Sequence, residues 1–145
     1  MRPVQLIFAC LLALPFAAAD PAAAAPPRPN LVYILADDLG WKDVGFHGSD
    51  IRTPNLDRLA AGGVRLEQFY AQPFCTPTRA ALMTGRYPHR YGLQTVVIPS
   101  AGTYGLATDE WLLPQALQQA GYRTAIVGKG HLGHADRKYW PRQRG

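Results

Sequence analysis

The chain has 145 residues, which suffice for one domain of ordinary size, and 48% of them are hydrophobic. Its formal net charge is +5, and no basic run alternates with aromatic residues, so we expect no nucleic-acid partner. A positive bias suits an anionic substrate, and a solvated basic face near the chain end explains it equally well. The basic residues near that end are Arg137, Lys138, Arg142 and Arg144.

Residues 1–19 have the layout of a secretory signal peptide. Arg2 supplies a positive charge, residues 6–19 are rich in Leu and Ala, and small residues precede Asp20. The apolar run is too short to span a bilayer, so no stable membrane insertion is expected. An apolar core helix is the alternative, but a proline within the run disfavours it. We expect export to a periplasmic, extracellular or lysosome-like compartment, with a Pro/Ala-rich leader at residues 20–29.

Between residues 30 and 70, strand and helix patterns alternate. Residues 30–36 form a nearly continuous apolar run, which is typical of a parallel strand buried on both faces. A helix is expected from Pro54 to Gly62, because Thr53 and the proline form a cap and a first turn. Residues 64–70 alternate as a second strand would.

The second half continues the alternation. Thr76 and Pro77 repeat the cap-plus-proline pattern and open a helix that runs to Met83, before a terminating glycine. A further helix is expected at residues 113–120 and a third strand at residues 122–127. This order predicts an α/β fold with a mostly parallel sheet, whose active-site residues follow the carboxyl ends of the strands.

Asp37 and Asp38 directly follow the first predicted strand. Adjacent carboxylates repel each other unless a cation neutralises them, and Ca²⁺ or Mg²⁺ prefers oxygen ligands. An Asp-Asp-Leu-Gly sequence also suits a turn at the end of a strand, and the pair alone favours that interpretation.

Cys75 is the only cysteine that would remain after removal of the signal peptide, because Cys10 lies within it. An exported chain with one cysteine cannot form an internal disulfide. The cysteine is then either a small buried residue of the core or a residue with a chemical role. The neighbouring residues Pro77 and Arg79 favour the chemical role of Cys75 over that of a small buried residue. The predicted helix begins beside the cysteine and would favour an anion there. Arg79 lies one turn further on the same helix, within hydrogen-bonding reach of residue 75. The segment does not resemble the tyrosine phosphatases, in which five residues separate the thiolate cysteine from the arginine, because three residues, including a proline, separate Cys75 from Arg79.

The stretch from Cys75 to Arg86 reads Cys-Thr-Pro-Thr-Arg-Ala-Ala-Leu-Met-Thr-Gly-Arg and resembles the signature of the type I sulfatases. In that family C-x-P-x-R marks a cysteine that a formylglycine-generating enzyme converts to an aldehyde. The resemblance implies an alkaline-phosphatase-like sulfatase sandwich and a catalytic calcium, with Mg²⁺ as the alternative. It also implies that Asp37, Asp38 and the modified Cys75 hold the ion. In that family one hydroxyl of the hydrated aldehyde attacks sulfur while the alcohol leaves, and the second hydroxyl loses its proton so that the sulfate is expelled and the aldehyde re-forms.

Residues 128–133 read Gly-Lys-Gly-His-Leu-Gly, where the family has Gly-Lys-Trp-His-Leu-Gly. The resemblance implies that Lys129 and His131 contact the sulfate and the formylglycine hydrate, so that Cys75, Arg79, Lys129 and His131 are the catalytic residues. Lys129 offers a compact positive charge and His131 can exchange protons. The glycine at position 130 lacks the packing that an aromatic side chain would give. Without the resemblance, residues 128–133 are better interpreted as a glycine-rich loop that carries two incidental polar residues.

We therefore expect a sulfatase that hydrolyses aryl sulfates or sulfated sugars, most similar to the arylsulfatase B-type branch. Residues 30–145 would form the amino-terminal part of its catalytic domain. The resemblance ends where family members continue with further metal and sulfate ligands, so we expect a fragment that turns over no substrate alone. Two alternatives remain open: a non-catalytic exported fragment, and a formylglycine-dependent phosphonate or phosphodiester hydrolase.

Overall fold

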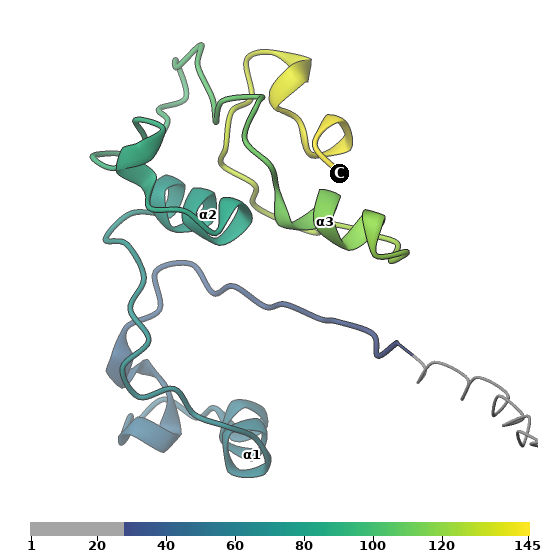
Figure 1. Cartoon of the computed structure of the whole chain (residues 1–145). Coiled ribbons are helices and arrows are strands. Elements are labelled where there is room, and N and C mark those ends of the chain that lie inside the picture. Colours follow the sequence, from purple (N-terminus) through teal and green to yellow (C-terminus); the bar gives the residue numbers. More distant parts are fainter. Residues whose placement is uncertain (1–27) are drawn as a thin grey trace, which may run out of the picture. The chain divides into compact units, whose positions relative to one another are not determined.

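The structure, a computed structural model, describes residues 28–145 and consists there of three α-helices, short 3-10 turns and extended connections (Figure 1). The predicted signal peptide and most of the predicted leader lie outside the described residues. The described residues fall into two units with the boundary between Leu35 and Ala36, and residues 36–145 hold every candidate site residue. None of the helices within residues 28–145 combines the length and apolar character needed to cross a membrane.

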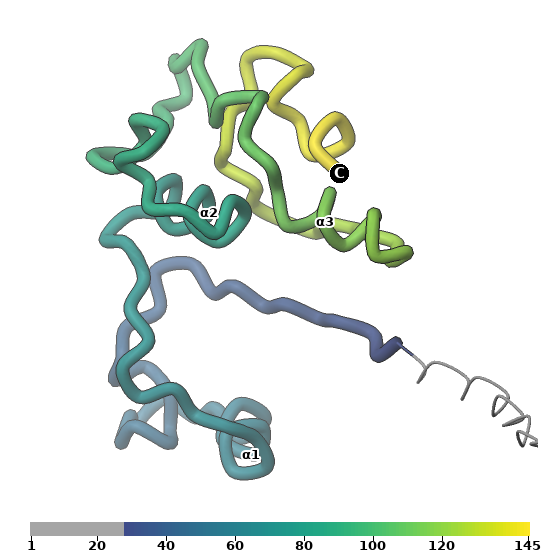
Figure 2. Tube along the Cα trace, in the orientation of Figure 1, coloured from purple at the N-terminus to yellow at the C-terminus, as the bar shows by residue number. Residues whose placement is uncertain are grey.

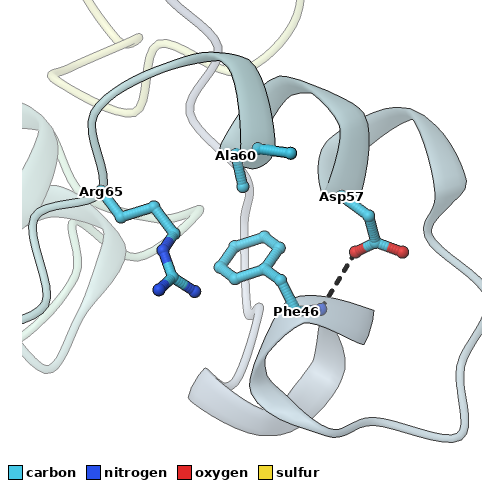
Figure 3. A pocket seen from close by; sticks show the side chains of 5 residues that line it. Phe46, Asp57, Ala60 and Arg65 are labelled. Carbon is cyan, nitrogen blue, oxygen red and sulfur yellow. Dashed lines mark hydrogen bonds between the residues drawn. The ribbon is translucent and has the colours of Figure 1, made fainter.

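Helix α1 spans Pro54–Gly62, as predicted from its flanking residues. The hydroxyl of Thr53 does not cap the helix through a backbone amide; it donates to Asp57 Oδ1 at 2.9 Å and accepts from the amide of Gly45 at 2.7 Å. Asp57 also accepts from the amide of Phe46 at 3.0 Å (Figure 3). These bonds join α1 to the 3-10 turn Gly45–His47.

A cavity of about 330 Å³ lies beside this junction and contains no candidate site residue. Its walls are formed by Phe46, Asp57, Ala60, Ala61 and Arg65. Figure 3 shows that the carboxylate of Asp57, the acidic group in this wall, is already engaged by a backbone amide. The cavity therefore presents an arginine, apolar side chains and a carboxylate whose Oδ1 already accepts two hydrogen bonds.

Helix α2 spans Cys75–Thr84 and ends at Gly85, which adopts a left-handed φ of 64° and donates to Ala81 O at 2.8 Å. The predicted cap at Thr76 is wrong, because the helix begins at Cys75 with Phe74 in the N-cap position. Thr76 thus lies inside the first turn. Its hydroxyl bonds to other segments of the chain, as described below.

Helix α3 spans Leu113–Gln119 and terminates before Gly121, whose φ is 84°, in agreement with the sequence. It contacts α2, and the two helices lie side by side (Figure 1). The amide of Leu112 donates to Gln115 Oε1 at 2.9 Å, which satisfies one of the groups that a helix start leaves unpaired. The buried hydrophobic cluster next to these helices consists of Ala80, Leu93, Ile98, Leu106 and Leu112.

Arg144 is not part of a solvated basic face. It is 7% exposed, and its guanidinium donates to the backbone oxygens of Leu106, Ala107 and Glu110 at 3.1, 2.9 and 3.3 Å. One of the four basic residues near the chain end therefore fastens this segment to the loop before α3.

The predicted strands are not formed within residues 28–145. Residues 30–36 and 122–127 run extended without ladder hydrogen bonds, and a turn at Glu67 and Gln68 interrupts residues 64–70 (Figure 2). Burial on both faces is not observed either, since Val127 is 99% exposed. A strand is defined by the neighbour that accepts and donates its backbone bonds, and no part of the described chain supplies one. The predicted sheet is therefore not confirmed.

Candidate active site

Cys75, Asp37 and Asp38 come together although 37 positions separate the thiol from the second carboxylate. Their ligand atoms lie within 4.8 Å of one another. The two aspartates occupy a bend after the extended segment, and Cys75 is the first residue of α2. The structure thus joins the residues that the sequence pattern marked as metal ligands.

Two basic side chains contact Asp37. Lys129 Nζ lies 2.6 Å from Asp37 Oδ2, and Arg79 Nη2 lies 3.1 Å from Oδ1. The hydrogen bond from Lys129, followed by that from Arg79, lowers the pKa of Asp37 from 3.8 to about 2. In turn, the carboxylate of Asp37 and then the sulfur of Cys75 raise the pKa of Lys129. Asp37 is accordingly ionised under all ordinary conditions.

Lys129 and Arg79 differ in how they relate to Cys75. Lys129 Nζ lies 3.3 Å from Cys75 Sγ, so a positive charge stands beside the predicted nucleophile position. Arg79 was expected to point toward residue 75, but its guanidinium donates to Asp37 and, at 2.6 Å, to the backbone oxygen of Lys129. Arg79 is 8% exposed. From this buried position it connects α2 to the segments that carry Asp37 and Lys129.

His131 lies two residues beyond Lys129 and is held by its ring. Its Nε2 is 2.9 Å from the backbone oxygen of Ile98, whereas its Nδ1 is buried without a hydrogen-bond partner. Its φ is 57°, and Asp38 has a φ of 54°. In the part of the chain that the structure describes, these are the two non-glycine residues with positive φ. Such backbone strain tends to occur at functional sites, and here both cases fall on predicted site residues.

The donor set fits a hard divalent cation in part. Two carboxylates offer the oxygen ligands that Ca²⁺ or Mg²⁺ prefers, whereas the thiol of Cys75 is a soft ligand. Replacement of the sulfur by an oxygen at residue 75 would make the set uniform. The described cluster supplies three ligands, fewer than the six to eight that Ca²⁺ takes.

The other polar candidates have structural partners. Arg86 Nη1 lies 2.6 Å from both carboxylate oxygens of Glu110. His47 stacks on Trp41 with 3.6 Å between ring centroids, and His134 Nε2 lies 2.9 Å from the backbone oxygen of Ser100. The sequence favoured structural roles for the two histidines and left Arg86 open between pairing with an anion and a structural salt bridge, and the structure has the salt bridge. Sequence reasoning missed Thr76, whose buried hydroxyl bonds to the His131 segment; a threonine in a helix start had suggested only a cap.

Comparison with known proteins identifies the family of the chain. A family profile described as Sulfatase matches residues 29–145. The chain is 49% identical to mouse arylsulfatase J over 118 residues, covering 81% of this chain and 20% of that protein. It is 46% identical to rat N-acetylgalactosamine-6-sulfatase over 143 residues, covering 92% of this chain and 26% of that protein. With human steryl-sulfatase the identity is 51% over 116 residues, covering 75% and 20% of the respective chains.

The crystal structure of Ps i-CgsB superposes with a TM-score of 0.72 at 45% identity, covering 77% of this chain and 25% of that one. A second structure of that protein, in complex with k-i-k-neocarrahexaose, gives a TM-score of 0.71 at 43% identity, covering 75% and 24%. The chain belongs to the sulfatase family. It spans about a quarter of the length of the relatives that it matches.

Proposed function

We propose that the intact protein hydrolyses sulfate esters and that residue 75, converted from cysteine to formylglycine, carries the nucleophile. The contact of Cys75 with Lys129, beside the carboxylates of Asp37 and Asp38, is the observation that carries the proposal. Family membership supports the reaction class. The conversion requires a formylglycine-generating enzyme as partner.

The side chains have distinct roles in this proposal. The ammonium of Lys129 attracts the sulfate oxygens and the developing negative charge on residue 75, from 3.3 Å away in the thiol form. Arg79 pairs with the carboxylate of Asp37 and fixes the backbone of Lys129. His131 exchanges protons with the hydrate or the leaving alcohol through its ring.

Asp37, Asp38 and residue 75 would hold Ca²⁺, with Mg²⁺ as the alternative ion. When bound, the ion supplies positive charge that lowers the cost of negative charge at the reacting oxygens. The carboxylate of Asp37 stays ionised and is therefore able to bind a cation. The bound cation and the ammonium of Lys129 would both contact this carboxylate. Further ligands would come from outside the described cluster.

Mass spectrometry of the peptide that contains residue 75, together with a hydrolysis assay, tests the proposal. The intact protein, produced with the formylglycine-generating enzyme, should show the mass loss of thiol-to-aldehyde conversion and release sulfate from an aryl sulfate. Cys75→Ser is the matched control: it keeps one hydroxyl but lacks the second, so it should retain a covalent sulfate on residue 75 and not turn over. Equal hydrolysis by Cys75→Ala would contradict the proposal.

The substrate class is compared in the same assay. Sulfated sugars and aryl sulfates are the substrates proposed, and the relatives named N-acetylgalactosamine-6-sulfatase and steryl-sulfatase support testing both a sugar and a sterol. Aryl phosphodiesters and phosphonates serve as competitors. Faster hydrolysis of a phosphonate than of any sulfate would assign the protein to the related hydrolase class.

We also propose that residues 1–19 direct export, that residues 20–29 are a leader, and that residues 30–145 belong to the catalytic domain. The family match begins at residue 29, which supports the last boundary. Residues 30–36, 64–70 and 122–127 would then be strands of a mostly parallel sheet in the sulfatase sandwich. Amide hydrogen exchange on the intact protein tests this, because paired strands should protect residues 31–35 and rapid exchange there would contradict the sheet.

A further inference from the structure

Thr76 lies at the centre of a closed set of hydrogen bonds next to the candidate active site. It is fully buried, and its hydroxyl donates to the backbone oxygen of His131 at 3.0 Å and accepts from the amide of Ile98 at 3.1 Å. The ring of His131 completes the set through its 2.9 Å contact with the backbone oxygen of Ile98. Three segments far apart in the sequence are thus joined by one threonine.

The chemistry of these groups determines where the protons lie. The amide of Ile98 can only donate, so the single hydroxyl proton of Thr76 is free to go to the oxygen of His131. The backbone oxygen of Ile98 can only accept, so His131 Nε2 must carry a proton. In the neutral ring Nδ1 is then the unprotonated atom, and it has no protein partner.

Helix α2 holds the loop of residues 129–131 at two points. Thr76 and Arg79 are three positions apart, so their side chains lie on one face of the helix, and both are buried. Thr76 binds the backbone oxygen of His131, and Arg79 binds that of Lys129. The helix that begins with Cys75 is thereby fastened to the loop that carries both predicted sulfate-contacting residues.

The backbone of His131 needs such support. A φ of 57° is unfavourable for a residue with a Cβ and persists where surrounding contacts enforce it. The bond from Thr76 acts directly on the peptide group of this residue. Loss of the hydroxyl would release that peptide group and leave the amide of Ile98 without its partner.

We propose that Thr76 is a positioning residue, whose hydroxyl holds His131 with Nε2 protonated and Nδ1 free to accept a proton. Its consequence for turnover rests on the proposed function, in which His131 transfers protons. The tautomer and the placement of His131 do not depend on that function, so they are measured separately.

The experiment compares Thr76→Val, which keeps the shape but lacks the hydroxyl, with Thr76→Ser, which keeps the hydroxyl. Thr84→Val is the matched control, because Thr84 lies on the same helix and donates within it to Ala80 O at 2.8 Å. Mass spectrometry of residue 75 gives the converted fraction in each intact variant, and rates are expressed per converted molecule. Any effect of position 76 on maturation is thereby removed from the comparison.

For Thr76→Val we expect kcat to fall roughly 10- to 100-fold with little change in KM, since misplacement of a reacting group has effects of this size. Thr76→Ser should restore most of the rate, and Thr84→Val should leave it unchanged. Nitrogen-15 NMR of His131 should report the Nε2–H tautomer in the parent and in Thr76→Ser, and a mixture in Thr76→Val.

A predominant Nδ1–H tautomer in the parent would overturn the proposal, and this measurement remains valid if Thr76→Val does not fold. A parent-like rate and tautomer in Thr76→Val, or no rescue by serine, would overturn it as well. If the parent shows the expected tautomer but no sulfatase activity, the proposed function fails while the placement of His131 stands.

Discussion

Replacement of Arg79 by methionine tests whether one buried guanidinium joins the candidate site. Methionine has similar length and flexibility but offers neither charge nor donors. It would remove the 2.6 Å bond to the backbone oxygen of Lys129 and the 3.1 Å ion pair with Asp37. Because Asp37 and Lys129 both belong to the predicted site, loss of these bonds should lower the stability of the protein and also displace the site residues.

The expected magnitude follows from the bond to Lys129 O. A hydrogen bond from a charged donor contributes roughly 1.5–3 kcal/mol, and relief of the buried charge of Arg79 offsets part of its loss. The ion pair with Asp37 adds little to stability, because Asp37 is 38% exposed and solvent screens the charges. We therefore expect Arg79→Met to lower the free energy of unfolding by about 2 kcal/mol.

Urea denaturation of the intact protein, followed by tryptophan fluorescence, measures this change as a lower midpoint at constant m-value. Arg79→Lys should lose about half as much, since an ammonium cannot contact both acceptors in the same fork geometry. The control is Arg58→Met on the exposed face of α1, where the guanidinium contacts only Asn55 and the change should stay within about 0.5 kcal/mol. If Arg79→Met changes stability no more than Arg58→Met does, the guanidinium of Arg79 does not hold the site together.

Three further predictions concern single positions. Gly130→Ala should stabilise the protein by about 0.5 kcal/mol in the same urea assay, because an added Cβ makes only an ordinary van der Waals contact with Pro141 at 3.9 Å and the backbone needs no positive φ; destabilisation would show that the loop needs a glycine. In metal-free protein, carbon-13 NMR of the Asp37 carboxylate should titrate near the pKa of about 2, and Lys129→Met should move this pKa toward 3.8. The depressed pKa means that the stabilisation is complete above pH 3.8 and is lost as the pH falls through about 2; an unchanged midpoint in Lys129→Met would contradict the assigned cause. Glu110→Gln should lower the free energy of unfolding by about 1 kcal/mol, because its nearly buried carboxylate pairs with Arg86, and a double-mutant cycle with Arg86→Met should give a coupling energy of that size.

The sequence predicted features that depend on neighbouring residues. Helix α1 begins and ends where Pro54 and Gly62 indicated, and Gly85 terminates α2, because a fixed φ or a left-handed φ acts within one turn. The short motif around Cys75 also indicated the family, which the comparisons show. The cap pattern placed Cys75 just before a helix, whereas the structure makes it the first residue of α2.

Only the tertiary structure decided which distant groups share a hydrogen bond. A threonine near a helix start signals a cap, yet Thr76 bonds to Ile98 and His131 because the fold brings those backbone groups to its buried face. Arg144 likewise binds carbonyl oxygens that no local pattern indicates. Strand pairing belongs to the same class: residues 30–36 have the composition of a buried strand, but a strand exists only where another segment supplies the matching donors and acceptors. Composition and spacing act locally, whereas hydrogen-bond partners are selected by the three-dimensional path of the whole chain.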